Sequence, residues 1–180
     1  MPYEKYRPIE APCAWKGAEM QQSTEWLRAF EAEELAEIDR ALQSAKRSGV
    51  DLFDIERDNF PLPTFSKELA KIAQELENGR GMVMLRGLPL SYSPEDLQIV
   101  YWGIGAHLGK PWAQNKHGHV LGDVTDQGKD IKDPTARGNE LGSVALPYPS
   151  DGSDLIGLMC LQKSQEGGVS TVCNALAIHN

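Results

Sequence analysis

The feature that most constrains this chain is a polar turn that runs directly into an apolar stretch near the C-terminus. The turn carries Asp151 and Asp154, and residues 155–162 (LIGLMCLQ) have the length and composition of a buried strand. A carboxylate at the mouth of such a strand is costly to bury unless a metal, a cation or a hydrogen-bond donor meets it. The pattern predicts such a partner for a carboxylate of this turn, although Asp154 is more typical of a turn or capping acid than of a ligand.

A second strand is predicted over residues 169–173, separated from the first by a turn at 164–168. Asn174 is placed to cap a helix that begins at residue 175. Cys160 falls inside the predicted strand over 155–162, where a free thiol behaves as a small hydrophobic group.

Hydrophobic spacing predicts a long helix over residues 24–47. Apolar side chains recur there at intervals of three and four, with Ser23 available as N-cap and Gly49 to end the helix. Four acids of this segment are expected to form a solvated face rather than to bind substrate or metal: Glu31, Glu33, Glu34 and Glu37.

Two further helices are predicted over residues 66–78 and 94–108, the latter with Ser93 as N-cap. A short apolar strand is expected over residues 81–85. Prolines and a lack of periodicity in residues 1–22 favour an extended arm or a partly disordered one.

Composition narrows the class of partner. The chain has 180 residues, which suits a single domain, and 18 Lys and Arg against 26 Asp and Glu give a net charge of −8. An acidic balance without a basic cluster argues against nucleic acid or an anionic membrane as partner. No apolar run approaches the roughly 20 residues of a membrane-spanning helix, and no secretory signal is evident. Three widely separated cysteines favour reduced thiols and a cytoplasmic protein.

Four segments carry a family resemblance: residues 79–89 (GRGMVMLRGLP), residues 101–105 (YWGIG), Asp151 with the apolar run behind it, and the Gly167-Gly168 turn. Together they resemble the taurine dioxygenase-like (TauD/TfdA) iron(II)/2-oxoglutarate-dependent oxygenases. The resemblance covers most of residues 25–180.

This resemblance implies an α+β fold. Its centre would be a double-stranded β-helix (a jelly roll of the clavaminate synthase-like kind) with flanking N-terminal helices, incomplete at the C-terminus. Residues 1–22 would be an N-terminal arm, and residues 23–180 the N-terminal part of a single oxygenase-like domain. A jelly roll hides its strand edges by pairing them, so open edges in this chain would favour self-association.

The resemblance also implies a site for iron(II) and 2-oxoglutarate. Enzymes of this kind hold iron with two histidines and one carboxylate. Asp151 matches the carboxylate, but Pro149 occupies the place of the first histidine, and proline cannot ligate a metal. The second histidine and the arginine that binds 2-oxoglutarate would lie beyond residue 180.

Two further residues are candidates for the site. Ser170 stands where the family places a hydroxyl against 2-oxoglutarate, although a strand-edge serine satisfied by backbone fits equally well. Asn115 is a candidate substrate-binding residue in a loop-rich stretch from 110 to 139, which is typical of a lid or a mobile segment. In the same stretch His117 and His119 have the spacing of a cupin-type metal pair, but their polar surroundings favour an exposed loop.

By resemblance, an intact relative would oxidise a small organic substrate with release of succinate and CO2. Pro149 and the missing ligands predict that this chain is inactive alone. The alternative is a non-catalytic relative or truncated product that acts as a binding or interaction protein.

Overall fold

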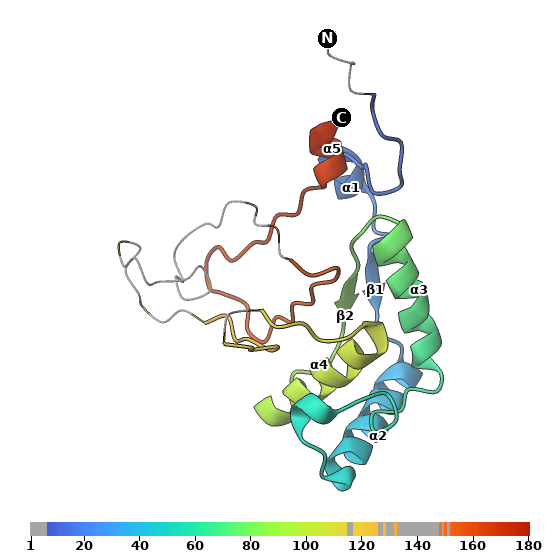
Figure 1. The fold of residues 1–180 in the computed structure, drawn as a ribbon, viewed down its shortest axis with the longest axis vertical. Helices are drawn as coiled ribbons and strands as arrows, with labels where there is room; N and C mark the ends of the chain where they lie inside the picture. Colours follow the sequence, from blue (N-terminus) through green and yellow to red (C-terminus); the bar gives the residue numbers. More distant parts are fainter. Residues whose placement is uncertain are drawn as a thin grey trace. The chain divides into compact units, whose positions relative to one another are not determined.

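The computed structural model describes residues 7–114, 117–125, 128, 132, 148, 150 and 152–180. The chain divides into two compact units, the first made of Met1–Lys110 and Gly157–Asn180 and the second of Pro111–Ile156. All helices and strands assigned in the described residues belong to the first unit (Figure 1).

The longest helix, α2, spans Ala32–Ser48 and ends at Gly49, whose φ of 67° lies in the left-handed region that favours glycine. Its buried apolar residues, Ile38, Ala41, Leu42 and Ala45, recur at helical spacing and form one stripe toward the core.

The prediction of a helix from residue 24 was wrong in its first part. Leu27–Ala29 forms strand β1, which pairs in parallel with β2, Met84–Arg86, so that Leu27 lies opposite Met84. Backbone bonds extend the pair at both ends, from Met84 N to Trp26 O at 2.7 Å and from Phe30 N to Arg86 O at 2.8 Å. Pairing with a distant strand therefore overrides the helical spacing of residues 24–30.

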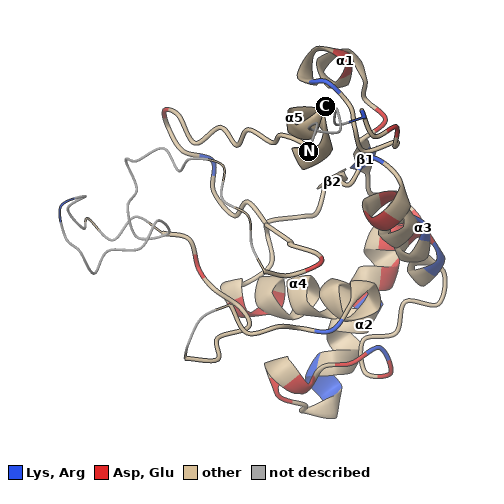
Figure 2. Cartoon of the chain, turned by 45° about the horizontal axis from the view of Figure 1, so that its top comes forward, with Lys and Arg blue, Asp and Glu red and all other residues tan. Residues whose placement is uncertain are grey.

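Acidic residues occur along α2 and α3 (Figure 2), but two of those on α2 are not solvated. Glu34 and Glu37 are 6% and 4% exposed, which corrects the predicted solvated face. The Glu37 carboxylate accepts hydrogen bonds from the backbone N–H groups of Thr64 at 2.7 Å and Phe65 at 3.1 Å. It thereby caps the first turn of α3, Phe65–Asn78, from another helix, where the helix dipole favours a negative charge.

Glu34 is held by a different partner. Both terminal guanidinium nitrogens of Arg28 on β1 donate to its carboxylate, Nη1 at 3.0 Å, and the Glu31 N–H donates at 2.9 Å. Burial disfavours the charged carboxylate, but the hydrogen bonds from Arg28 and from the Glu31 backbone outweigh it and lower the pKa of Glu34.

The remaining helices before residue 110 confirm their predictions. α3 begins one residue before the expected position, and α4 spans Pro94–Leu108 with the Ser93 hydroxyl accepting from Asp96 N at 3.1 Å. At the end of α4 the Arg57 side chain donates to the Ala106 carbonyl at 3.0 Å. A 3₁₀ turn, η1 at Leu52–Asp54, lies between α2 and α3.

α4 approaches the core most closely at Gly103. A Cβ built on Gly103 would lie 2.4 Å from the ring of Phe60, which is fully buried. His107 Nε2 also shares a hydrogen bond of 2.8 Å with the Phe60 carbonyl. Glycine at 103 therefore allows the Phe60 loop to pack directly against the helix.

The two strands predicted after residue 154 were wrong. Within residues 155–162 and 169–173 the structure has no strand, and Cys160 is exposed rather than buried. The sheet assigned in the described residues has two strands, β1 and β2, so the jelly roll is not confirmed and stays a prediction.

Short helices lie near both ends of the first unit. α1, Gly17–Gln22, occurs in the segment expected to be extended, and α5, Ala175–His179, confirms Asn174 as its N-cap, with bonds from Leu176 N and Ala177 N. The Asn180 amide binds the backbone of Ile9 twice, accepting from its N–H at 2.8 Å and donating to its carbonyl at 2.9 Å. Among the helices of the described part, none is long and apolar enough to cross a membrane.

Candidate functional site

Three of the predicted site residues, Asn115, Pro149 and Asp151, lie outside the described residues. Ser170 and Asp154 are described, and both are exposed. Ser170 makes no hydrogen bond to another described residue, so its hydroxyl is not used by the neighbouring backbone. Both interpretations of Ser170, as a co-substrate contact and as a serine satisfied by backbone, stay predictions.

The turn before Ser170 has the conformation that its glycines predict. Gly167 and Gly168 have φ values of 70° and 65°, and the Ser164 hydroxyl donates to the Gly167 carbonyl at 3.0 Å. Two successive left-handed residues are readily accepted only when both are glycine. The Gly-Gly turn is thus set locally, independently of a sheet around it.

His117 and His119 are exposed, as their polar surroundings predicted, and their ring centroids lie 5.9 Å apart. Gln114 binds the backbone at and after His119, donating from its backbone N to His119 O at 2.7 Å and from its side chain to Val120 O at 3.0 Å. Across the described residues, no three His, Cys, Asp or Glu side chains gather closely enough to hold a metal ion.

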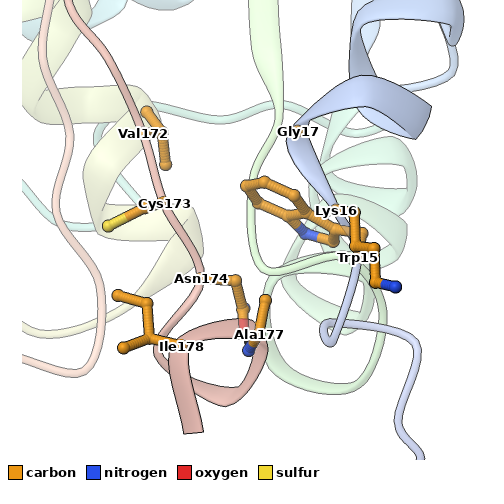
Figure 3. Close-up of a pocket in the computed structure, with 8 residues that line it drawn as sticks. All are labelled: Trp15, Lys16, Gly17, Val172, Cys173, Asn174, Ala177 and Ile178. Carbon is orange, nitrogen blue, oxygen red and sulfur yellow. Dashed lines mark hydrogen bonds between the residues drawn. The ribbon is translucent and has the colours of Figure 1, made fainter. Parts of the chain in front are cut away.

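A hollow of about 260 Å³ lies between the N-terminal segment and α5 in the first unit. Trp15 and Lys16 line it from one side, and Val172, Cys173 and Ile178 from the other (Figure 3). The Trp15 indole N–H donates to the Arg80 carbonyl at 2.8 Å, so it is not available to a ligand. The lining is mostly apolar, and the side-chain oxygen of Asn174, one of its polar groups, already caps α5.

α4 meets the chain that follows the polar turn at one point. Tyr101 of α4 is half-buried, and burial raises the pKa of its phenol. A Cβ built on Gly157 would lie 2.7 Å from the Tyr101 hydroxyl oxygen. The sequence reasoning missed this contact, although a lone glycine inside an apolar run is a known sign of close backbone approach.

Comparison with known proteins decides the family. Residues 39–180 match the taurine catabolism dioxygenase TauD, TfdA family, which is most of the chain. This protein belongs to the TauD/TfdA family. The segments that carried the resemblance after residue 39 all lie within the matched region.

Two relatives of this TauD/TfdA member come from distant organisms. FR-33289 synthase of Streptomyces rubellomurinus is 31% identical over 176 residues, which cover 97% of this chain and 52% of the relative. The taurine hydroxylase-like protein SAT17 of Stachybotrys chartarum is 25% identical over 174 residues, covering 93% of this chain and 45% of the relative. The chain thus spans about half the length of the curated relatives it matches.

The iron site typical of this family can be tested against the donors present in this TauD/TfdA member. At the position expected for the first histidine stands Pro149, which has no imidazole. The described histidines and acids do not supply a substitute cluster. Proline at position 149, and the lack of a substitute cluster among the described residues, do not fit a site of two histidines and one carboxylate.

Proposed function

We propose that this protein is a dioxygenase-type TauD/TfdA member whose iron site is defective at Pro149, and that the chain alone does not turn over substrate. The observation that carries the proposal is family membership over residues 39–180 combined with proline in the position of a ligand. The reaction class expected of the family is oxidation of a small organic substrate, coupled to conversion of 2-oxoglutarate to succinate and CO2.

Two residues of this chain have proposed roles in that site. Asp151 would supply the carboxylate ligand, and the Ser170 hydroxyl would contact 2-oxoglutarate. Support for Ser170 comes from its exposure and from the left-handed Gly167-Gly168 turn, which precedes it as in the family pattern. Asn115 is proposed as a substrate contact on sequence grounds alone.

Anaerobic calorimetry with iron(II) and 2-oxoglutarate tests the proposal, with the natural chain measured beside a Pro149→His variant. We expect no iron binding by the natural chain and a measurable gain in the variant, because an imidazole and a carboxylate two residues apart supply two of the three ligands. Tight iron binding by the natural chain would overturn the assignment and direct attention to His117 and His119.

Alanine substitution of each of two nearby aspartates, in the Pro149→His background, tests which of them binds the iron. Loss of an outer partner of a metal ligand costs about 10- to 100-fold in affinity, and loss of the ligand itself costs more. Asp151→Ala should therefore abolish the gain. Asp154→Ala, three residues further along an exposed turn, should leave it within about twofold.

The second candidate function is a non-catalytic binding protein. Pro149 favours it, because a protein that no longer binds iron can still retain a surface for a small molecule or a partner. Retention of 2-oxoglutarate binding by the natural chain without iron, lost on Ser170→Ala, would support this reading over a defective enzyme that binds neither.

We also propose that the chain self-associates through the apolar side chains that it exposes after residue 154. Leu158 and Val169 are 81% and 86% exposed, and both strands of the two-stranded sheet are edges within the described residues. Sedimentation velocity over a hundredfold concentration range should show association that a Leu158→Ser, Val169→Ser double variant reduces. A strictly monomeric natural chain would contradict it.

A further inference from the structure

The contact between Tyr101 and Gly157 occurs where the chain returns to the first unit. The N-terminal part of that unit ends at Lys110, and its C-terminal part begins at Gly157. Residues 111–156 therefore form a long segment that leaves the first unit and returns to it. α4 provides the departure point a few residues before Lys110, and the same helix carries Tyr101. α4 therefore ends just before the 111–156 segment in the sequence and contacts Gly157, the first residue after it.

The geometry at Gly157 leaves no space for a side chain. A Cβ there would lie 2.7 Å from the hydroxyl oxygen of Tyr101, 3.4 Å from Cζ and 3.6 Å from Cε2. The first distance is far below van der Waals contact, whereas the other two are ordinary. Only the hydroxyl oxygen makes the approach too close for an alanine.

Tyr101 is poorly placed to move out of the way. Its ring is half-buried on α4, and its neighbour Trp102 is buried and donates from its indole N–H to the Ile55 carbonyl at 3.2 Å. Trp102 points away from Tyr101 on the helix, so the restraint on Tyr101 is its own half-burial, which limits the rotamers open to the ring.

We infer that Tyr101 is a positioning residue: its hydroxyl sets the point at which the 111–156 segment rejoins α4, and glycine at 157 is required for that approach. Asp151 lies in the 111–156 segment, six residues before Gly157. The effect of this contact on the oxygenase-type site rests on the proposed function, in which Asp151 is a metal ligand. Fixing the end of a long segment reduces the conformations open to the residues near that end.

The first test measures the contact itself, without iron. The chain is labelled with 3-fluorotyrosine, and the Tyr101 signal among the five tyrosines is assigned by Tyr101→Phe. Gly157→Ala should shift the Tyr101 fluorine resonance and leave the other signals in place. Gly152→Ala is the matched control, since a Cβ at Gly152 meets nothing within 4 Å.

The second test measures anchoring by the rate of tryptic cleavage within residues 111–156. Gly157→Ala should raise this rate about tenfold, in line with the cost of overpacking a close contact. The double variant Gly157→Ala, Tyr101→Phe should restore it to within about twofold, because the nearest ring atom is then 3.4 Å away. If Gly157→Ala changes neither the fluorine signal nor the cleavage rate, or if Tyr101→Phe fails to rescue it, the inference is wrong.

A third measurement separates this inference from the proposed function. In the Pro149→His background, Gly157→Ala should weaken iron binding, and addition of Tyr101→Phe should recover it. The double variant could restore the tryptic cleavage rate while no Pro149→His form binds iron. That result would contradict the proposed iron site and leave the positioning role of Tyr101 intact.

Discussion

Two regions of this molecule contain similar apolar residues but bury them to different extents. One is the helical region from residue 32 to 108, and the other is the segment from 152 to 173. Every buried apolar side chain of the described part lies between Ile38 and Trp102. In the later segment Ile156, Leu158 and Val169 are all more than half exposed. Apolar composition alone does not make a core, because burial requires a partner surface with matching periodicity.

Polar groups show the same contrast. In the helical region Glu37 caps α3 and Arg57 binds the end of α4, so helix ends are satisfied by side chains from other elements. In residues 152–173 the Ser164 hydroxyl makes a local bond to the Gly167 carbonyl. The first region is held by many long-range contacts, whereas the second combines local turn geometry with the contact of Gly157 at Tyr101.

The largest expected effect compares one apolar residue from each region. Phe60→Ala should lower the free energy of unfolding by about 3–5 kcal/mol, because the ring is fully buried against Gly103. Leu158→Ala should change it by less than about 0.5 kcal/mol, since the side chain is 81% exposed. Urea unfolding measures both, and equal losses would mean that Leu158 is buried in solution.

Removal of the long-range cap should have the next largest effect. Glu37→Ala leaves the Thr64 and Phe65 N–H groups without their acceptor inside the protein, at a cost of about 2–3 kcal/mol. The control is Glu33→Ala on the exposed part of the same helix, expected within about 0.5 kcal/mol of the natural chain. Equal effects of the two changes in thermal unfolding would show that the cap does not form.

Two glycines of α4 sharpen the comparison within one helix. Gly103→Ala should destabilise by about 1–2 kcal/mol, because overpacking against Phe60 outweighs the gain in helix propensity. Gly105→Ala should stabilise by up to about 1 kcal/mol, since a Cβ there meets nothing within 4 Å. Stabilisation by both changes would place Phe60 away from α4.

The smallest effect depends on pH. Because the pKa of Glu34 is lowered in the folded protein, its contribution to stability is complete above its ordinary value of 4.5 and is lost as the pH falls below that value. Glu34→Gln should cost about 1 kcal/mol at pH 7 and much less at pH 3, after allowance for the partial exposure of Arg28. An identical loss at both pH values would exclude the charged pair as its source.

Local signals in the sequence were enough to predict part of this fold. Ser93 and Pro94 predicted the start of α4, and Asn174 the cap of α5, because a cap depends on residues within one turn. The long-range features were missed. β1 depends on a partner more than fifty residues away, and Glu34 and Glu37 are buried because Arg28 and the start of α3 meet them.

The candidate site also has some features that local sequence predicted and others that depend on distant parts of the chain. The Gly167-Gly168 turn followed from glycine chemistry alone, whereas strands 155–162 and 169–173 required a sheet that the described residues do not form around them. Asp151, Pro149 and Asn115 stay predictions, since they lie outside the described residues. The cytoplasmic location and the arm at residues 1–22 are likewise untested.

The double hydrogen bond between Asn180 and Ile9 has a consequence for how the molecule assembles during synthesis. It joins residues 171 positions apart, so all residues up to Asn180 must be made before the amide can meet its partner. The helices from 32 to 108 depend on nearer neighbours and can fold while the ribosome is still adding residues. Docking of the N-terminal segment onto Asn180 therefore follows the folding of these helices, and until it occurs Ile9 and its neighbours are open to proteases and chaperones.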